Sequence, residues 1–172
     1  ESRGLGDVYK RQVSYQDYPS SAEFSHNNGN VDDEYYREGI FVGYRYFDTF
    51  GIKPQYCFGF GRSYTDFSIQ TVAVKADERQ VILDVEVTNT GSVYSGKEVV
   101  QVYYSAPEGT LEKPYQELAA FAKTRLLSPG EKQRMEIRFA TTDMASYDTE
   151  DASYKLEEGE YLLRVGNSSR NT

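Results

Sequence analysis

Paired carboxylates are the first candidates for chemistry in this chain, because two neighbouring carboxyl groups can act as general acid and general base. Two such groups occur, Asp32-Asp33-Glu34 and Glu157-Glu158. Adjacent acidic residues in loop-like sequence are more often solvated surface than an acid/base pair. We therefore predict that neither group is catalytic.

Histidine and cysteine are too few for several kinds of site. The chain has a single His and a single Cys, which excludes an internal disulfide, a thiolate metal cluster and a multi-histidine metal site and leaves little scope for a triad. His26 lies in an Asn- and Gly-rich loop and is expected to be exposed and without a role. Cys57, between Tyr56 and Phe58, is predicted to be a buried small hydrophobe rather than a reactive thiol.

Two short motifs resemble functional signatures but lack their context. Gly59 and Gly61 form a G-x-G without the third glycine and the following helix of a dinucleotide site. Asn167-Ser168-Ser169 fits the N-glycosylation pattern, which recurs by chance and would be meaningless in a bacterial cytoplasmic protein. We therefore assign no catalytic, cofactor-binding or metal-binding residue in this chain, and no cofactor.

Two further groups leave alternatives open. Arg45 and Asp48 lie among many aromatic residues, where they could form an ion pair, hydrogen-bond the backbone or help to shape a distant substrate cleft; we favour a structural role. Tyr103, Tyr104 and Tyr115 could form an aromatic platform for a sugar, although tyrosines in strands more often pack on their neighbours.

Composition excludes other classes of protein. The chain has 172 residues and a formal net charge of −8, which disfavours nucleic acid because phosphates would repel it. The mean hydropathy is −0.68, and no apolar run approaches the roughly 20 residues of a membrane helix. These values predict neither a nucleic-acid partner nor a membrane span.

An aromatic stretch at residues 36–67 organises the chain. It holds 11 of the 25 aromatic residues and five glycines. Each ring can bury about 150–250 Å², and glycine permits the tight turns that such packing needs. We interpret this stretch as a buried connector between two bodies.

Residues 67–168 carry strand patterns with turn signals between them, which predicts a β-sandwich of about seven strands. Strands are expected within residues 67–74, 80–88, 97–105, 132–140, 153–156 and 161–165, and residues 142–146 suit a short helical turn. Residues 116–124 are ambiguous between helix and strand. The core is predicted to bury Leu83, Val85, Val99, Ile137, Phe139, Leu163 and Val165 between the two sheets.

The first part of the chain looks different. Residues 1–12 show no apolar periodicity and resemble translated adapter sequence, with a flexible native tail as the alternative. Residues 13–35 are loop-rich and turn-rich. About 54 residues at positions 13–66, without an obvious set of helices or strands, cannot enclose a core alone.

The connector carries a family resemblance. Its segments EGI (38–40), VGYRYFD (42–48) and FGFGRSYT (58–65) resemble the junction of three-domain family 3 glycoside hydrolases, where the second catalytic domain meets a fibronectin type III-like domain. Arg62 replaces the usual Leu, and Cys57 stands where Pro is common. Similarity to the fibronectin type III-like domain continues through the strand region, so the resemblance covers about residues 13–170.

The resemblance implies a fold and a domain division. The fold class is all-β: a fibronectin type III-like (immunoglobulin-like) β-sandwich at 67–170, preceded at 13–66 by the remnant of a truncated α/β domain, which includes the loop-rich connector. Residues 1–12 would be a non-native or disordered tail. With the preceding domain missing, part of the connector is expected to expose apolar surface, with the exposed rings among Phe41, Tyr44, Tyr46 and Phe47.

The resemblance also implies a function. The parent would be a β-glucosidase that hydrolyses terminal non-reducing β-D-glucosyl or related β-glycosyl residues by a retaining two-carboxylate mechanism. The family's nucleophile lies in an "SDW" pattern on an N-terminal barrel, and its acid/base Glu lies upstream of this chain; with no Trp the chain lacks the pattern. The chain alone is therefore expected to be inactive. Its implied partners are a β-glucoside or oligosaccharide substrate and the missing barrel and α/β sandwich domains.

Two other classes remain as alternatives: a free-standing carbohydrate-binding module, for which exposed tryptophans would be expected, and a protein-interaction module. A connector rich in aromatic residues favours the severed enzyme over both. The sequence leaves the compartment open, with the cytoplasm preferred.

Overall fold

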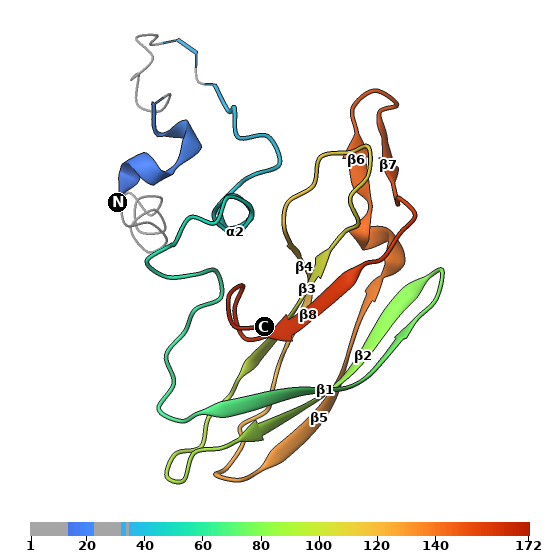
Figure 1. Ribbon diagram of the computed structural model, residues 1–172. Coiled ribbons are helices and arrows are strands. Elements are labelled where there is room, and N and C mark those ends of the chain that lie inside the picture. Colours follow the sequence, from blue (N-terminus) through green and yellow to red (C-terminus); the bar gives the residue numbers. More distant parts are fainter. Residues whose placement is uncertain (1–13, 23–31, 34) are drawn as a thin grey trace.

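A computed structural model describes residues 14–22, 32–33 and 35–172 (Figure 1). The predicted tail at 1–12, His26 and Glu34 lie outside the described residues. The chain folds as a β-sandwich with an irregular N-terminal segment along one side (Figure 1). None of the described helices combines the length and the apolar character needed to cross a bilayer.

The sandwich consists of two antiparallel three-stranded sheets and one small hairpin, which confirms the predicted all-β fold. The first sheet has the order β1-β2-β5, with β1 at Phe67–Ala76, β2 at Gln80–Asn89 and β5 at Lys132–Ala140. The second has the order β4-β3-β8, with β4 at Glu117–Lys123, β3 at Val99–Ser105 and β8 at Leu162–Gly166. β6 at Ser146–Asp148 and β7 at Ser153–Lys155 form the hairpin.

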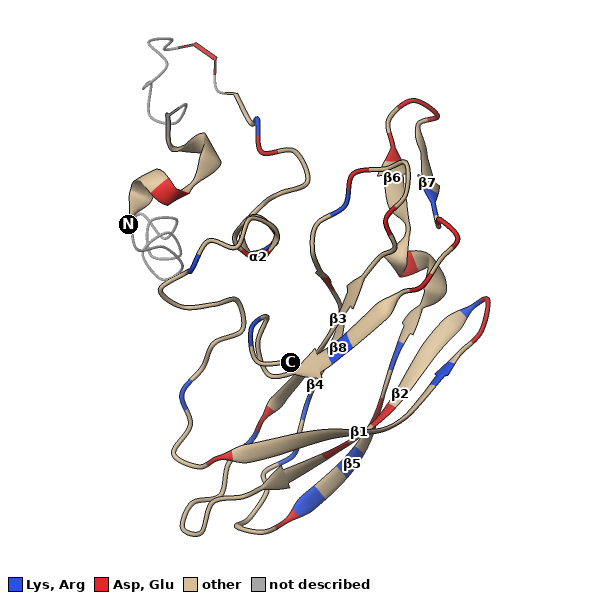
Figure 2. Cartoon of the chain, in the orientation of Figure 1, with Lys and Arg blue, Asp and Glu red and all other residues tan. Residues whose placement is uncertain are grey.

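Strict alternation in β2 determines which of its faces is buried. Its inward side chains are fully or almost fully buried, and Leu83 lies opposite Ile137 of β5 in the register. Its outward carboxylates meet cations of β5: Asp84 Oδ2 lies 2.7 Å from Arg134 Nη2, and Glu86 Oε1 lies 2.7 Å from Lys132 Nζ. Charges of both signs are visible on these strands in Figure 2. Such exposed pairs contribute only about 0.2–1 kcal/mol each, so the inward face stabilises the sheet.

The predicted core is largely confirmed, with one error. Leu83, Val85, Ile137 and Phe139 are buried together, and Leu163 and Val165 pack against them while half-buried. The prediction that Val99 is buried in the core is wrong. Val99 is half-buried and outside the core cluster, whereas Val100, Val102 and Tyr104 point inward from the same strand. The reason is register, because a strand that is apolar on both faces does not reveal which face meets the opposite sheet.

Other elements refine the prediction. Residues 116–124, ambiguous in sequence, form strand β4 at the edge of its sheet. The expected helical turn is the 3-10 helix η4 at Thr141–Met144, and Met144 joins the core. Strand β6 was not predicted, because three residues are too few to show an alternating pattern.

The N-terminal segment contains short helices that the sequence did not indicate. Two 3-10 helices, η1 at Tyr15–Asp17 and η2 at Pro19–Ala22, precede the six-residue helix α2 at Tyr44–Thr49. After α2, Gly51 adopts φ +66°, and the Ile52 N–H donates to the Phe47 carbonyl at 3.0 Å. This left-handed glycine closes the helix in a Schellman arrangement. One and a half turns are too short for a hydrophobic period to appear in sequence.

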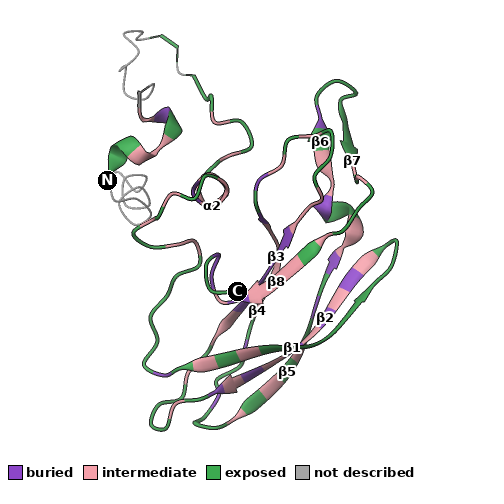
Figure 3. Cartoon of the chain, viewed as in Figure 1, coloured by how far each residue is buried: buried purple, intermediate pink, exposed green. Residues whose placement is uncertain are grey.

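The connector covers the outer face of the β4-β3-β8 sheet. Tyr44 of α2 stacks on Phe58 with ring centroids 4.7 Å apart, and its ring meets Tyr103 of β3 at 5.9 Å. Phe47 is 1% exposed. Phe41, Tyr44 and Tyr46 are half-buried, so the prediction that the exposed rings lie among these four residues is wrong. Figure 3 shows buried and half-buried residues at α2. Neighbouring rings of the connector and the sandwich bury these side chains.

Candidate functional site

The acidic groups singled out in the sequence do not form an acid/base pair among the described residues. Asp32 and Asp33 are exposed, and Glu34 lies outside the described residues. Glu158 is exposed, while its neighbour Glu157 is half-buried and engaged by another loop.

Glu157 anchors the loop between β3 and β4. It accepts hydrogen bonds from the backbone N–H and the hydroxyl of Thr110, both at 2.8 Å, and forms a salt bridge with Lys113. The Lys113 ammonium, followed by the two Thr110 donors, lowers the pKa of Glu157 to about 2. Glu157 is thus ionised near neutral pH and serves as a structural group.

Arg45 and Asp48 do not pair with each other, so that alternative is wrong. Arg45 Nη2 lies 2.7 Å from Glu117 Oε2 on β4, and Asp48 Oδ1 accepts from Arg170 Nε at 2.8 Å. Arg45 and Asp48 are three positions apart on α2, but each is directed to a different part of the sandwich. Both therefore fasten α2 to the sandwich, in agreement with the favoured structural role.

Asp48 and Arg170 form the centre of a contact that we call the latch, together with Gln116. The Asp48 side chain is 3% exposed and also accepts from Gln116 Nε2 at 3.0 Å. Arg170 Nη2 donates in addition to the backbone carbonyls of Phe47 and Ile52, at 2.9 and 2.8 Å. A buried carboxylate is tolerated only when donors replace its water. The latch thereby holds α2 against the end of the chain.

The tyrosines considered as a sugar platform separate into two kinds. Tyr103 and Tyr104 are buried, and burial raises the pKa of both phenols. They cannot contact a ligand. Tyr115 is 50% exposed and lies in the loop before β4. Only Tyr115 of the three is available for binding.

The remaining sequence candidates have structural roles. Cys57 is half-buried rather than fully buried as predicted. Gly59 adopts φ +82°, and a Cβ there would lie 2.3 Å from Nε2 of Gln101, so its absence of a side chain serves close packing. Asn167 donates to Glu98 Oε2 at 3.1 Å and is followed by the buried Ser168.

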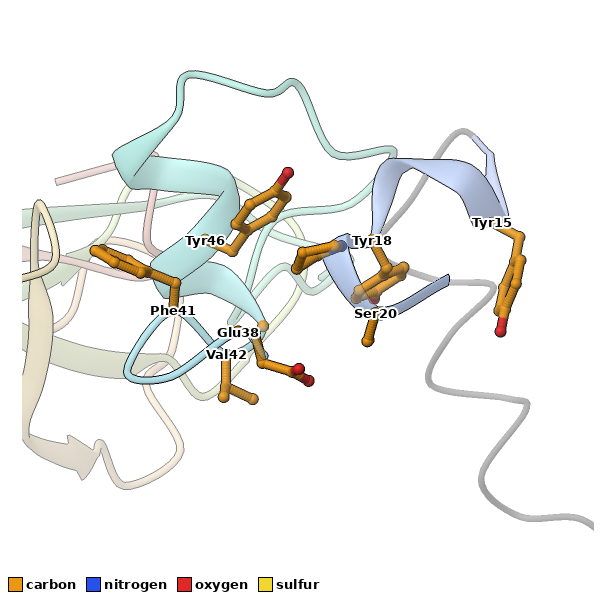
Figure 4. A pocket seen from close by; sticks show the side chains of 9 residues that line it. Tyr15, Tyr18, Ser20, Glu38, Phe41, Val42 and Tyr46 are labelled. Atoms are coloured by element: carbon orange, nitrogen blue, oxygen red, sulfur yellow. The ribbon is translucent and has the colours of Figure 1, made fainter. Parts of the chain in front are cut away.

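An apolar pocket of about 180 Å³ lies between the 3-10 helices and α2 (Figure 4). Glu38 and Val42 line one side, and Tyr18 and Ser20 line the other. Glu38 is the pocket's single carboxylate, and its Oε2 has no hydrogen-bond partner in the described part of the chain. One carboxylate cannot supply both a nucleophile and an acid/base group. In the described ranges, no three His, Cys, Asp or Glu side chains are grouped to hold a metal ion.

Residues 98–169 match the family described as the fibronectin type III-like domain. Among curated proteins, β-glucosidase A of Butyrivibrio fibrisolvens is 45% identical over 162 residues, covering 84% of this chain and 19% of the relative. The β-glucosidase of Ruminococcus albus is 46% identical over 133 residues, covering 77% of this chain and 13% of the relative. The chain thus spans less than a fifth of the length of these relatives.

Solved structures of β-glucosidases show the same similarity to this chain. A β-glucosidase from Paenibacillus barengoltzii is 46% identical with a TM-score of 0.84, covering 92% of this chain and 18% of that chain. β-Glucosidase 3B from Thermotoga neapolitana, in complex with glucose, is 43% identical with a TM-score of 0.85, covering 93% of this chain and 22% of that chain. A GH3 β-glucosidase from Bifidobacterium adolescentis is 34% identical with a TM-score of 0.85 over 93% of this chain and 23% of that chain. The chain therefore corresponds to the C-terminal portion of a glycoside hydrolase family 3 β-glucosidase, with its fibronectin type III-like domain.

Proposed function

We propose that this chain is the C-terminal structural part of an enzyme that hydrolyses terminal non-reducing β-D-glucosyl residues. The observation that carries the proposal is an identity of 43–46% over more than nine-tenths of the chain to β-glucosidases of solved structure. One of those enzymes is seen in complex with glucose, which supports a glucosyl substrate.

The proposed mechanism is retaining hydrolysis, with both catalytic carboxylates supplied from outside this chain. Retention requires two carboxyl groups about 5–5.5 Å apart. Three carboxylates that lie on α2 or pack on it or on the loop before β4 already have cationic partners: Asp48 binds Arg170, Glu117 binds Arg45 and Glu157 binds Lys113. The chain by itself is therefore proposed to be inactive.

The proposed contribution of this chain is to support its preceding domains through the connector. Several large apolar side chains remain exposed along it: Tyr36, Ile40, Val42, Phe50, Tyr56, Phe60 and Tyr64. Exposed apolar surface of this extent marks an interaction site. We propose residues 13–66 as the end of an α/β domain and residues 67–170 as the fibronectin type III-like domain, with a barrel and the α/β domain as partners.

Two assays test the proposal. The purified chain should show no saturable hydrolysis of an aryl β-glucoside. A chimera in which this chain replaces the matching segment of Thermotoga neapolitana β-glucosidase 3B should hydrolyse the same substrate, whereas that enzyme truncated before the segment should not. Saturable hydrolysis by the chain alone would contradict the proposed division of labour. A soluble but inactive chimera would contradict the proposed supporting role and favour a free-standing binding or interaction module.

A further inference from the structure

Two adjoining pockets lie between α2, the loop at residues 106–116 and the C-terminal segment. One has a volume of about 350 Å³ and the other about 550 Å³. Tyr115 and Arg164 line both pockets, so these two side chains form the shared wall. We call the two pockets together the Tyr115 groove. Its size is that of a small-molecule site.

Arg164 and Tyr115 form a fixed unit in this wall. The Arg164 guanidinium carbon lies 4.6 Å from the centroid of the Tyr115 ring, and Nη2 donates to the Tyr115 hydroxyl at 3.1 Å. Nη1 donates to the Ser105 hydroxyl, which in turn donates to the Tyr115 carbonyl. No carboxylate lies within ion-pair distance of Arg164 among residues 14–22, 32–33 and 35–172. A guanidinium has five N–H donors, so this one retains donors for a ligand.

The floor of the smaller pocket carries acceptors that the protein leaves unused. Gln116 is 1% exposed and Ser169 is 4% exposed, and Gln116 Oε1 and Ser169 Oγ have no hydrogen-bond partner in the described residues. Gln116 Nε2 donates to Asp48 Oδ2 at 3.0 Å and to the Ser169 carbonyl at 2.6 Å. These two acceptors determine the orientation of the amide, so Oε1 is held as an acceptor. Leaving such a group unpaired is unfavourable, and a ligand hydroxyl would offset that cost.

The charges that line the groove nearly cancel. Arg170 is bound to Asp48, and Lys113 is bound to Glu157. Glu108 lines the larger pocket and carries a charge opposite to that of Arg164. A half-exposed ring, free N–H donors and unused acceptors together suit a ligand that has an apolar ring face and many hydroxyl groups.

We propose that the Tyr115 groove binds a neutral oligosaccharide, with one sugar ring against Tyr115 and hydroxyl groups paired with Arg164 and Gln116. A pyranose combines a C–H face, which packs on an aromatic ring, with hydroxyls that both donate and accept. The choice of glucosyl units rests on the proposed function. The Tyr115 groove would add a sugar-binding site on the sandwich itself.

The test is a titration of the 172-residue chain with cellotetraose, followed by amide chemical shifts in two-dimensional NMR. Saturable shifts are expected in the loop at 106–116 and at residues 164–169. Tyr115→Ala and Arg164→Met should each weaken binding about tenfold, as expected for the loss of an aromatic or a charge-assisted contact. Tyr115→Phe retains the ring and should lose less. Tyr154, 75% exposed on β7 and outside the groove, provides the matched control: Tyr154→Ala should bind as the parent does.

Several outcomes would overturn the inference. The absence of saturable shifts with cellotetraose, or shifts that map outside the groove, would refute the site. Weakening of cellotetraose binding by Tyr154→Ala as large as that by Tyr115→Ala would refute the role of Tyr115. Tighter and salt-sensitive binding of oligogalacturonate would make the ligand an acid. Unchanged amide spectra away from the groove show that each variant is folded. An active chimera combined with a chain that binds no sugar would refute the groove alone, whereas sugar binding combined with an inactive chimera would refute the proposed function alone.

Discussion

Asp48 illustrates how a single residue of the connector depends on distant parts of the chain. Its almost fully buried carboxylate accepts hydrogen bonds from Gln116 and from Arg170, which lies 122 positions away in the sequence. Neither donor is a sequence neighbour, so no local pattern indicates the pair. The latch therefore appears only once the chain has folded.

Removing the Arg170 side chain should weaken the latch. Arg170→Met leaves Asp48 buried with a single side-chain donor, and a charged group left underpaired costs about 2–3 kcal/mol. We expect urea unfolding to show a loss of that size, together with faster amide exchange in α2. Arg134→Met is the control, because the Arg134 pair with Asp84 is exposed and its loss should cost less than about 1 kcal/mol. Equal effects from both variants would argue against a special role for the latch.

Glu157 gives a pH dependence of defined sign. Its pKa is lowered from the ordinary 4.5 to about 2, so the folded state favours the ionised form. This stabilisation is complete above the unfolded pKa and is lost as the pH falls from about 5 through the folded pKa of about 2. Glu157→Gln should have a lower melting temperature than the parent at pH 7, and the difference should shrink towards pH 2. Glu158→Gln, at an exposed position, should show no such convergence.

At the scale of elements, the connector and strand β3 fit together because one glycine admits close contact. Gly59 combines a left-handed backbone with a Cβ position only 2.3 Å from the Gln101 amide. The Gln101 side chain cannot easily move away from an added Cβ, because its Nε2 donates to the Asn167 carbonyl at 2.9 Å and its Oε1 accepts from the Tyr103 hydroxyl. The contact therefore couples the connector to both β3 and the end of β8.

Gly59→Ala should loosen this contact, whereas Gly61→Ala should not. The left-handed conformation costs a non-glycine residue about 1–2 kcal/mol, and the methyl clash adds to it. Gly61 has ordinary backbone angles and nothing within 4 Å of its Cβ position. Thermal unfolding and hydrogen exchange of the connector measure the difference. A Gly61→Ala variant as damaged as Gly59→Ala would show that general connector flexibility, and not this contact, is responsible.

At the scale of the whole molecule, the connector packs on the sandwich from α2 onward. Phe47 is buried, the Tyr44 hydroxyl accepts from the Leu118 N–H at 2.8 Å, and the Ser169 N–H donates to the Phe58 carbonyl at 2.9 Å. Just before α2, by contrast, several large side chains are exposed, among them those of Tyr35, Tyr36, Ile40 and Val42.

Limited proteolysis should therefore cut before α2 and not within it. Chymotrypsin is expected to cleave first at Tyr35 or Tyr36, both exposed, and to leave a resistant fragment that includes α2 and the sandwich. Mass spectrometry of the first stable product identifies the site. A stable product that begins after Phe47 would mean that the latch does not hold α2 in solution. The Arg170→Met variant should shift cleavage towards that later site.

Local sequence patterns were sufficient to predict the class of fold and the core of the β1-β2-β5 sheet. A period of two is local, and the alternate apolar positions of β2 mark the face that is buried, so Leu83 and Val85 were identified correctly. The family motifs in the connector also identified the β-glucosidase relatives. Each of these signals lies within a few consecutive residues.

The burial of particular aromatic residues of the connector, and the pairing of particular polar residues, depend on tertiary packing and could not be predicted from local sequence. Phe47 is covered because Tyr18 and Tyr46 pack edge-on against its ring, and Asp48 is neutralised by the far end of the chain. Val99 was misassigned for the same reason, since both faces of β3 are apolar and the opposite sheet selects one. Local patterns report the preference of a segment for burial, whereas the burial of a given side chain depends on neighbours that are remote in sequence and brought together only by folding.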